Sequence, residues 1–191
     1  MSFNFDKVIP RAGTNSVKFD LRKQIFGTEE VIPMWVADMD FEVPPFVAEA
    51  MKKRVEHAVY GYSILPDTYF HAIMGWQKRR HGWEVEKEWI HYTPGVVTAL
   101  NLLVEAFTNP GDSIVVQSPV YFPFFWAVER HGRVLLNNTL LESNNRYSID
   151  FDDLESKLKS GARMMILCSP HNPVGRAWTR EELERIARMC L

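Results

Sequence analysis

The sequence predicts an α/β fold in which a mostly parallel sheet is covered by helices on both faces. From residue 88 onward, short apolar runs typical of buried strands alternate with longer segments in which apolar residues recur every three or four positions. Turn signals rich in Gly, Pro and Asn separate these segments. Strands that alternate with helices in this way usually pair in parallel, because each helix carries the chain back across one face of the sheet.

The N-terminal third has a different pattern. Residues 1–33 carry scattered charges and Gly or Pro breaks, which predict an irregular arm that packs over a body or a partner subunit. Pro44 and Pro45 suit a helix start, and apolar residues follow on one helical face up to Ala58. A second helix is predicted over 67–81, where Gly82 ends the pattern.

The elements after residue 88 can be assigned in order. Strands are expected at 89–92, 113–117, 133–136 and 164–168, and helices at 97–107, 122–131, 152–158 and from 180 onward. Asp152 with Glu155 and Thr179 with Glu182 resemble capping boxes that open the last two helices. The apolar face of the final helix continues to Leu191 without a stop signal, which predicts that the sequence is part of a longer protein.

Composition narrows the class of protein. The chain has 191 residues, of which 46% are hydrophobic and 24% charged, and this balance is typical of a globular domain. A formal net charge of −2 gives no general reason to expect nucleic acid or an anionic membrane as partner. No apolar run approaches a membrane span, and the N-terminus lacks the apolar core of a signal peptide. Two cysteines without a C-x-x-C pair favour a reduced, cytoplasmic chain.

Three stretches that follow predicted strands are candidates for ligand binding. The first is Thr93-Pro94-Gly95-Val96-Val97, which opens a helix. Gly95 lets the backbone approach a ligand closely, and the unpaired amides of a first helical turn suit a phosphate. Taken alone, the stretch is weak, because an ordinary strand-to-helix turn explains it as well.

The second and third candidates also follow strands. Tyr121, in Ser118-Pro119-Val120-Tyr121, offers an aromatic face for a flat heterocycle, although a Tyr packed on its own helix is the simpler explanation. Asn172, in Cys168-Ser169-Pro170-His171-Asn172-Pro173, can donate and accept hydrogen bonds, and a turn-stabilising Asn is the alternative.

The three candidates make a stronger hypothesis together than singly. In a parallel sheet the carboxyl ends of the strands share one edge, so a phosphate cup, a stacking ring and an amide would meet there. That set suits a flat phosphorylated cofactor. Metal-binding His spacings, a G-x-S-x-G elbow and a G-x-G-x-x-G fingerprint are absent from the sequence. Asp38 and Asp40 are too close in sequence for a confident acid/base pair.

The motifs resemble those of a known family. The chain is similar to the N-terminal half of fold-type I pyridoxal-phosphate (PLP) enzymes, the class I/II aminotransferase superfamily, and more narrowly to the MalY/PatB group of C–S lyases, or cystathionine β-lyases. The stretches that carry the resemblance are PMWVADMDF (33–41), YGY (60–62), TPGVV (93–97), SPVYFPF (118–124) and CSPHNPVGRAW (168–178). The resemblance implies a three-layer, mostly parallel large domain, here incomplete. Residues 1–45 would form an N-terminal arm and part of a small domain, and residues 46–191 the first part of the PLP-binding large domain.

The resemblance also implies roles for particular residues. Gly95, Val96 and Val97 match the turn whose backbone holds the phosphate of pyridoxal 5'-phosphate. Tyr121 matches the aromatic residue that stacks on the pyridine ring, and Asn172 matches the amide that bonds the 3-oxygen of that ring.

Two further matches concern the partner subunit and the substrate. Tyr62 matches the tyrosine that reaches the phosphate of the neighbouring subunit, which implies a homodimer. Ala37 lies in the stretch that lines the substrate pocket. No catalytic residue of the family falls within this chain, because the Schiff-base lysine is expected beyond residue 191.

The resemblance implies a β-elimination that turns cystathionine or another cysteine S-conjugate into a thiol, pyruvate and ammonia. An aminotransferase of the same fold is the nearest alternative. A truncated, non-catalytic chain that only binds a ligand or a partner is the alternative from another class. By the resemblance, the 191-residue chain alone would be inactive, because it lacks the Schiff-base lysine.

Overall fold

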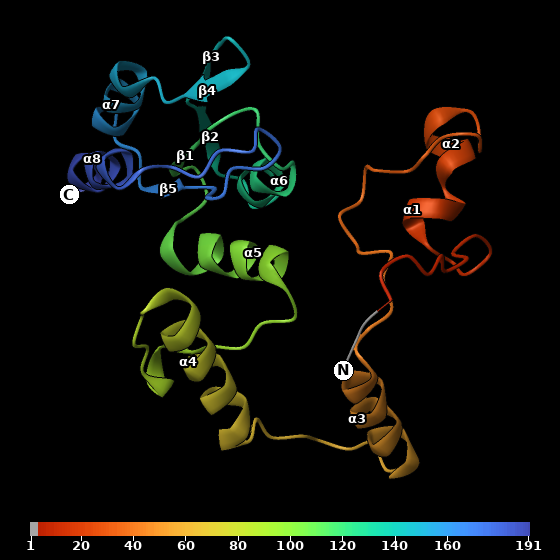
Figure 1. The fold of residues 1–191 in the computed structure, drawn as a ribbon. Coiled ribbons are helices and arrows are strands. Elements are labelled where there is room, and N and C mark those ends of the chain that lie inside the picture. The colour runs from red at the N-terminus through yellow and green to blue at the C-terminus, as the bar shows by residue number, and fades with distance from the viewer. Residues whose placement is uncertain (1–3) are drawn as a thin grey trace. The chain divides into compact units, whose positions relative to one another are not determined.

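A computed structural model describes residues 4–191 (Figure 1). The chain divides into two compact units, one ending at Pro66 and the other spanning Asp67–Leu191. The domain boundary expected after residue 45 stays a prediction.

The first unit contains the short helices α1 (Val17–Asp20) and α2 (Arg22–Phe26) and the longer α3 (Pro45–Glu56). The start of α3 confirms the predicted helix, with Pro45 in its first turn. The two short helices lie in the arm that the sequence analysis expected to be irregular, so that expectation was wrong for residues 17–26. Their four and five residues are too few for an apolar period to show in the sequence.

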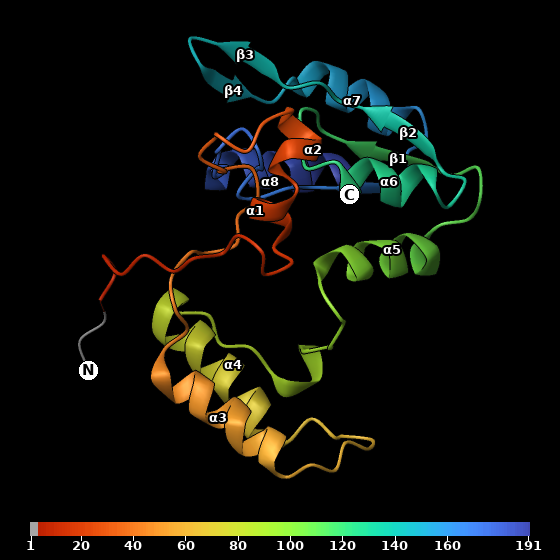
Figure 2. The ribbon, with the colours of Figure 1, turned by 90° about the vertical axis from the view of Figure 1, so that its right-hand side faces the viewer.

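The second unit contains the sheet and most of the helices (Figure 2). Its elements in chain order are α4 (Asp67–His81), η1 (Lys87–Trp89), α5 (Val96–Phe107), β1 (Ser113–Val116), α6 (Pro123–Glu129), β2 (Val134–Asn137), β3 (Leu141–Ser143), β4 (Arg146–Ser148), α7 (Phe151–Lys159), β5 (Met164–Ile166) and α8 (Arg180–Cys190). All the helices predicted after residue 66 are therefore present, with ends within a few residues of those expected.

The central sheet is parallel, as predicted, with strand order β2-β1-β5. Side chains of β1 alternate between two apolar clusters. Ile114 and Val116 belong to a cluster with α5 and α6, whereas Val115 belongs to a second cluster with α7 and α8. Because successive residues of a strand point to opposite faces, helices cover both faces of the sheet and the unit has three layers.

Several local predictions were wrong. Residues 89–92 do not form a sheet strand, because η1 ends at Trp89 through a hydrogen bond from the Trp89 amide to the Glu86 carbonyl (3.1 Å). The antiparallel hairpin of β3 and β4 was not predicted. Helix α7 is capped by Asp150, whose side chain accepts a hydrogen bond from the Asp153 amide, and not by Asp152. The capping box of Thr179 and Glu182 is confirmed.

Two features of the described chain bear on its surroundings. No helix in residues 4–191 is both long and apolar enough to cross a membrane. Many large apolar side chains are exposed, among them Leu102, Leu103 and Phe107 of α5.

A buried polar bridge links β1 to the start of α7. The Asn138 side chain is fully buried; its oxygen accepts a hydrogen bond from Gln117 Nε2 (2.9 Å), and its Nδ2 donates to Asp153 Oδ2 (2.8 Å) and to the Asp150 carbonyl (3.0 Å). Buried polar groups cost free energy when they lose their partners, so this amide ties the two elements together.

Replacing Asn138 with Ala should lower the free energy of unfolding by about 2 kcal/mol, because Gln117 Nε2 would be left buried without its acceptor. Urea denaturation of the 191-residue chain measures the change. Asn137→Ala is the matched control, since Asn137 is exposed and should shift the free energy by less than about 0.5 kcal/mol. Equal effects of the two variants would contradict the structural role of the bridge.

Candidate cofactor-binding site

The two loops that follow β1 and β5 lie at the same edge of the sheet. β1 and β5 are neighbouring parallel strands with Val116 opposite Ile166, so both loops leave from their carboxyl ends. We call residues 117–122 and 167–179 the edge loops. The backbone amide of Tyr121 donates a hydrogen bond to the carbonyl oxygen of Asn172 (2.8 Å). The structure therefore brings together two of the residues that the sequence analysis singled out.

Both side chains are accessible to a ligand. The Tyr121 side chain is 40% exposed, and Asn172 is also exposed. The Asn172 backbone amide donates a hydrogen bond to Cys168 Sγ (3.4 Å), which holds the loop without using the side-chain amide. The ring of Tyr121 packs against Phe122 at a centroid distance of 4.9 Å. The exposed amide and the exposed ring face can thus both serve a flat polar ligand.

The stretch 93–97 forms the start of α5, as predicted. Gly95 is the residue before the helix and has φ +108°, a conformation that residues with a Cβ rarely adopt. A Cβ built there would meet no atom of the chain, so the space beside the backbone is open. The amides of Val96 and Val97 lie in the first helical turn, where no carbonyl of the same helix can accept them. No hydrogen bond within residues 4–191 joins this turn to Tyr121 or Asn172.

Tyr62 and Ala37 lie in the first compact unit. Tyr62 is fully exposed in the segment between α3 and the end of the unit, and Ala37 is exposed in the segment between α2 and α3. Their predicted roles toward the cofactor and the substrate stay predictions.

Ala37 is followed by a charge cluster that the sequence analysis did not foresee. The buried Lys18 Nζ pairs with Asp40 Oδ2 (2.8 Å) and donates to the Asp38 carbonyl (3.1 Å). Arg11 pairs with both carboxylates, at 2.5 Å from Asp40 Oδ1. Asp38 and Asp40 are therefore held in ion pairs by α1 and the arm. A lysine in a polar arm gives no sequence signal of this burial, because it depends on a contact about 20 residues away.

The carboxyl group of Asp40 forms ion pairs with both cations, Lys18 and Arg11. Hydrogen bonds from Lys18 and then Arg11 lower its pKa below the ordinary value of 3.8. Because a lowered pKa favours the ionised form in the folded chain, the stabilisation is present above pH 3.8 and is lost as the pH falls through the lowered pKa.

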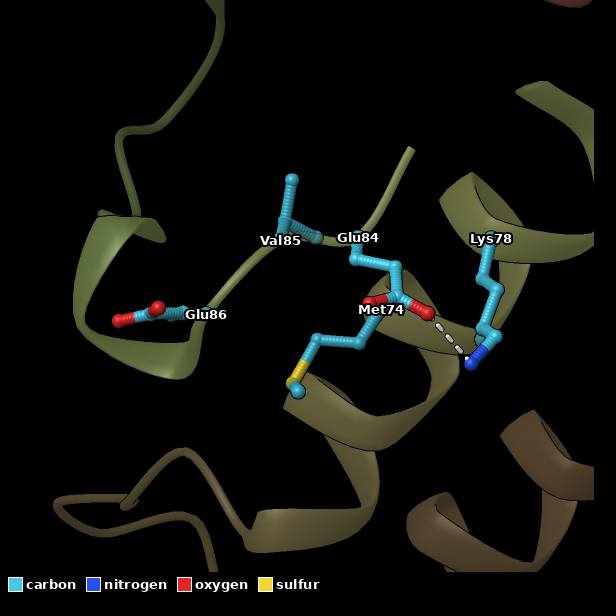
Figure 3. Close-up of a pocket in the computed structure, with 6 residues that line it drawn as sticks. Met74, Lys78, Glu84, Val85 and Glu86 are labelled. Atoms are coloured by element: carbon cyan, nitrogen blue, oxygen red, sulfur yellow. Dashed lines mark ion pairs between the residues drawn. The ribbon is translucent and has the colours of Figure 1, made fainter. Parts of the chain in front are cut away.

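A separate pocket of about 370 Å³ lies between α4 and the segment that follows it (Figure 3). Its lining includes Lys78 and Glu84, which pair with each other at 2.6 Å. None of the predicted cofactor residues lines it. Because Lys78 and Glu84 satisfy each other, this pair offers a ligand no free charge, and Glu86 is the third charged residue of the lining. Within residues 4–191, no group of three or more His, Cys, Asp or Glu side chains is placed to hold a metal ion.

A parallel sheet covered by helices on both faces, with an aromatic ring and an amide at its carboxyl edge, defines a three-layer α/β protein with a candidate ligand site at that edge. Residues 29–191 match the family described as aminotransferase class I and II. The chain belongs to this family.

Individual relatives are more specific. The chain is 50% identical over 189 residues to cystathionine beta-lyase PatB of Bacillus subtilis (strain 168), covering 98% of this chain and 49% of that protein. It is 33% identical over 190 residues to protein MalY of Escherichia coli (strain K12), covering 98% and 49%. The crystal structure of cystalysin from Treponema denticola, which contains a pyridoxal 5'-phosphate cofactor, matches with a TM-score of 0.91 and 38% identity over 99% of this chain and 49% of that one. The chain spans about half the length of the curated relatives it matches.

Replacing Lys18 with Met should raise the pKa of Asp40 toward 3.8, because the largest cause of its lowering is removed. NMR titration of the Asp40 carboxyl carbon measures this change. Asp20 is an internal control, since its pKa is lowered chiefly by the backbone amide of Gly13. Lys23→Met, at an exposed position of α2, should leave the pKa of Asp40 unchanged. An unchanged value in the Lys18 variant would contradict the ion pair.

Proposed function

We propose that this chain is the N-terminal portion of a PLP-dependent C–S β-lyase that acts on cystathionine or a similar cysteine S-conjugate. The reaction consumes one water and releases a thiol, pyruvate and ammonia. Its support is the identity of 50% to a cystathionine beta-lyase. The structural observation that carries it is the hydrogen bond that places Tyr121 beside Asn172 at the carboxyl edge of the sheet (2.8 Å).

The donor set fits pyridoxal 5'-phosphate. The open backbone at Gly95 and the first-turn amides of Val96 and Val97 suit a phosphate dianion at the positive end of the α5 dipole. The exposed ring of Tyr121 suits stacking on a pyridine ring. The exposed amide of Asn172 suits a hydrogen bond to the ring's 3-oxygen.

When bound, the cofactor supplies an electron sink for the bond-breaking steps. This chain's own residues hold and orient it: the α5 turn binds the phosphate, Tyr121 limits the tilt of the ring and Asn172 fixes its rotation. The proton transfer at the substrate belongs to a lysine that we expect beyond residue 191. The 191-residue chain is therefore a binding scaffold and does not complete the reaction alone.

We further propose that the enzyme is a cytoplasmic homodimer in which Tyr62 reaches the phosphate of the neighbouring subunit. The full exposure of Tyr62 supports this role, because its hydroxyl is available to a partner. The exposed apolar side chains of α5 support a protein–protein interface. Ala37, held beside the charge cluster of Lys18 and Asp40, would line the pocket for the amino-acid substrate.

Two alternatives give different products. The family name favours an aminotransferase of the same fold, which would give a 2-oxo acid and an aminated acceptor without releasing a thiol. A chain that only binds a ligand or a partner is the alternative from another class, and it would release none of these products.

The first test uses protein purified from its natural gene. Its intact mass, its visible absorbance and the mass added by borohydride reduction reveal whether a lysine holds the cofactor. We expect a visible band that reduction fixes to the protein. A protein whose mass matches residues 1–191 and that shows no band would overturn the catalytic proposal and favour the binding alternative.

The second test separates lyase from aminotransferase. With cystathionine as substrate, the lyase releases pyruvate, ammonia and homocysteine in equal amounts without an acceptor, whereas an aminotransferase requires a 2-oxo acid. Asn172→Ala should weaken PLP binding about 3- to 10-fold, the loss expected for one or two hydrogen bonds. Asn109→Ala, in the exposed turn before β1, is the matched control and should bind PLP normally.

A further inference from the structure

His171 is the most deeply buried titratable side chain of the edge loops, with 1% of its surface exposed. It precedes Asn172 directly, and its side chain reaches the other edge loop. Its Nε2 lies 3.0 Å from the carbonyl oxygen of Pro119, two residues before Tyr121. A backbone hydrogen bond from the Tyr121 amide to the Asn172 carbonyl also joins these two stretches, so the imidazole provides a second tie.

The chemistry of this contact fixes the form of the ring. A carbonyl oxygen only accepts hydrogen bonds, so Nε2 must carry a proton and donate it. Burial lowers the pKa of the imidazole, and the carbonyls of Pro119 and Gln117 only partly oppose this effect. The lowered pKa favours the neutral ring, whose Nδ1 is buried and makes no hydrogen bond within residues 4–191. A buried, neutral imidazole that already donates to a carbonyl is poorly placed to exchange protons with a substrate.

The loop around His171 is itself held rigidly. The His171 amide donates to the Arg176 carbonyl (2.6 Å) and the Gly175 amide donates to the His171 carbonyl (2.8 Å). The imidazole meets Trp178 edge to face at a centroid distance of 5.5 Å, and Trp178 Nε1 donates to the Cys168 carbonyl (2.9 Å). Because these contacts hold the loop around His171 in place, the hydrogen bond from His171 Nε2 to the Pro119 carbonyl restrains the loop that carries Tyr121.

We propose that His171 is a positioning residue that sets the separation between the Tyr121 ring and the Asn172 amide. This inference rests on the proposed function, in which the Tyr121 ring stacks on the pyridine ring of the cofactor and the Asn172 amide bonds the 3-oxygen of the same ring. The His171–Pro119 contact and the Tyr121–Asn172 bond together fix the spacing and the angle between the two edge loops, whereas one bond alone would fix only the spacing. Loss of the imidazole contact would let the Tyr121 loop pivot about the remaining bond to Asn172.

Three substitutions of His171 separate the effects of side-chain length, side-chain volume and hydrogen-bond donation. Gln places an amide nitrogen about where Nε2 lies, so His171→Gln keeps a donor to Pro119. His171→Asn has the same chemistry but is too short to reach that carbonyl. His171→Phe keeps an aromatic ring, larger than the imidazole, and removes the donor. His131→Phe is the matched control, because the imidazole of His131 bonds Asn101 and Glu105, which both lie in α5 and outside the edge loops.

The test uses the holoprotein from its natural gene and measures the dissociation constant for PLP and the visible circular dichroism per bound cofactor. His171→Asn and His171→Phe should weaken binding about 3- to 10-fold, the loss of one buried hydrogen bond, and should change the circular dichroism. His171→Gln should restore both values, and His131→Phe should leave both unchanged. A loss of stability alone would not alter the dichroism of cofactor that remains bound.

Hydrogen exchange of the Tyr121 amide, measured without cofactor, tests the tie independently. It should accelerate in the Asn and Phe variants and remain slow in the Gln variant. Unchanged PLP binding, dichroism and exchange in His171→Phe would overturn the inference, and if that variant does not fold, the Asn and Gln pair decides. A wild-type protein that binds no PLP would instead overturn the proposed function, and the positioning role with it, whatever the exchange rates are.

Discussion

Parallel pairing between β1 and β5 places the two edge loops side by side. The pairing is held by side chains on both faces of β1: Ile114 and Val116 are fully buried on one face and Val115 on the other. Each such side chain contributes about 1.5–3 kcal/mol of burial free energy. Because β1 is the middle strand, a shift in its register would change its pairing with both β2 and β5 and would displace the loop that carries Tyr121.

Apolar burial brings the elements together, and polar contacts then fix how they are oriented. The Asn138 bridge ties the end of β1 to α7, and the His171 contact ties the β1 loop to the β5 loop. In the first unit, Lys18 and Arg11 hold the carboxylates that follow Ala37. These contacts are specific in direction, so they fix orientation where burial, which is not directional, fixes only proximity.

The site was partly predictable for a physical reason. Gly95, Tyr121 and Asn172 each follow a local pattern, an apolar run and then a turn, that can be recognised within about ten residues. Of the three candidates expected to meet at one edge, Tyr121 and Asn172 do so through their hydrogen bond. Gly95 follows η1 and not a strand, so the expectation that each candidate follows a strand was wrong for Gly95. Residues 89–92 have the composition of a strand, but Trp89 and Tyr92 are exposed and belong to no strand among residues 4–191.

The sequence by itself determined the α/β class, the two-faced burial of β1, the capping box at Thr179 and the residue types offered to a ligand, because these depend on neighbours within one or two turns of chain. Only the tertiary structure decided that His171 donates to Pro119 and that Lys18 is buried against Asp40. Those contacts join residues about 50 and 20 positions apart. No local period encodes them, because they exist only once the sheet and the arm have folded.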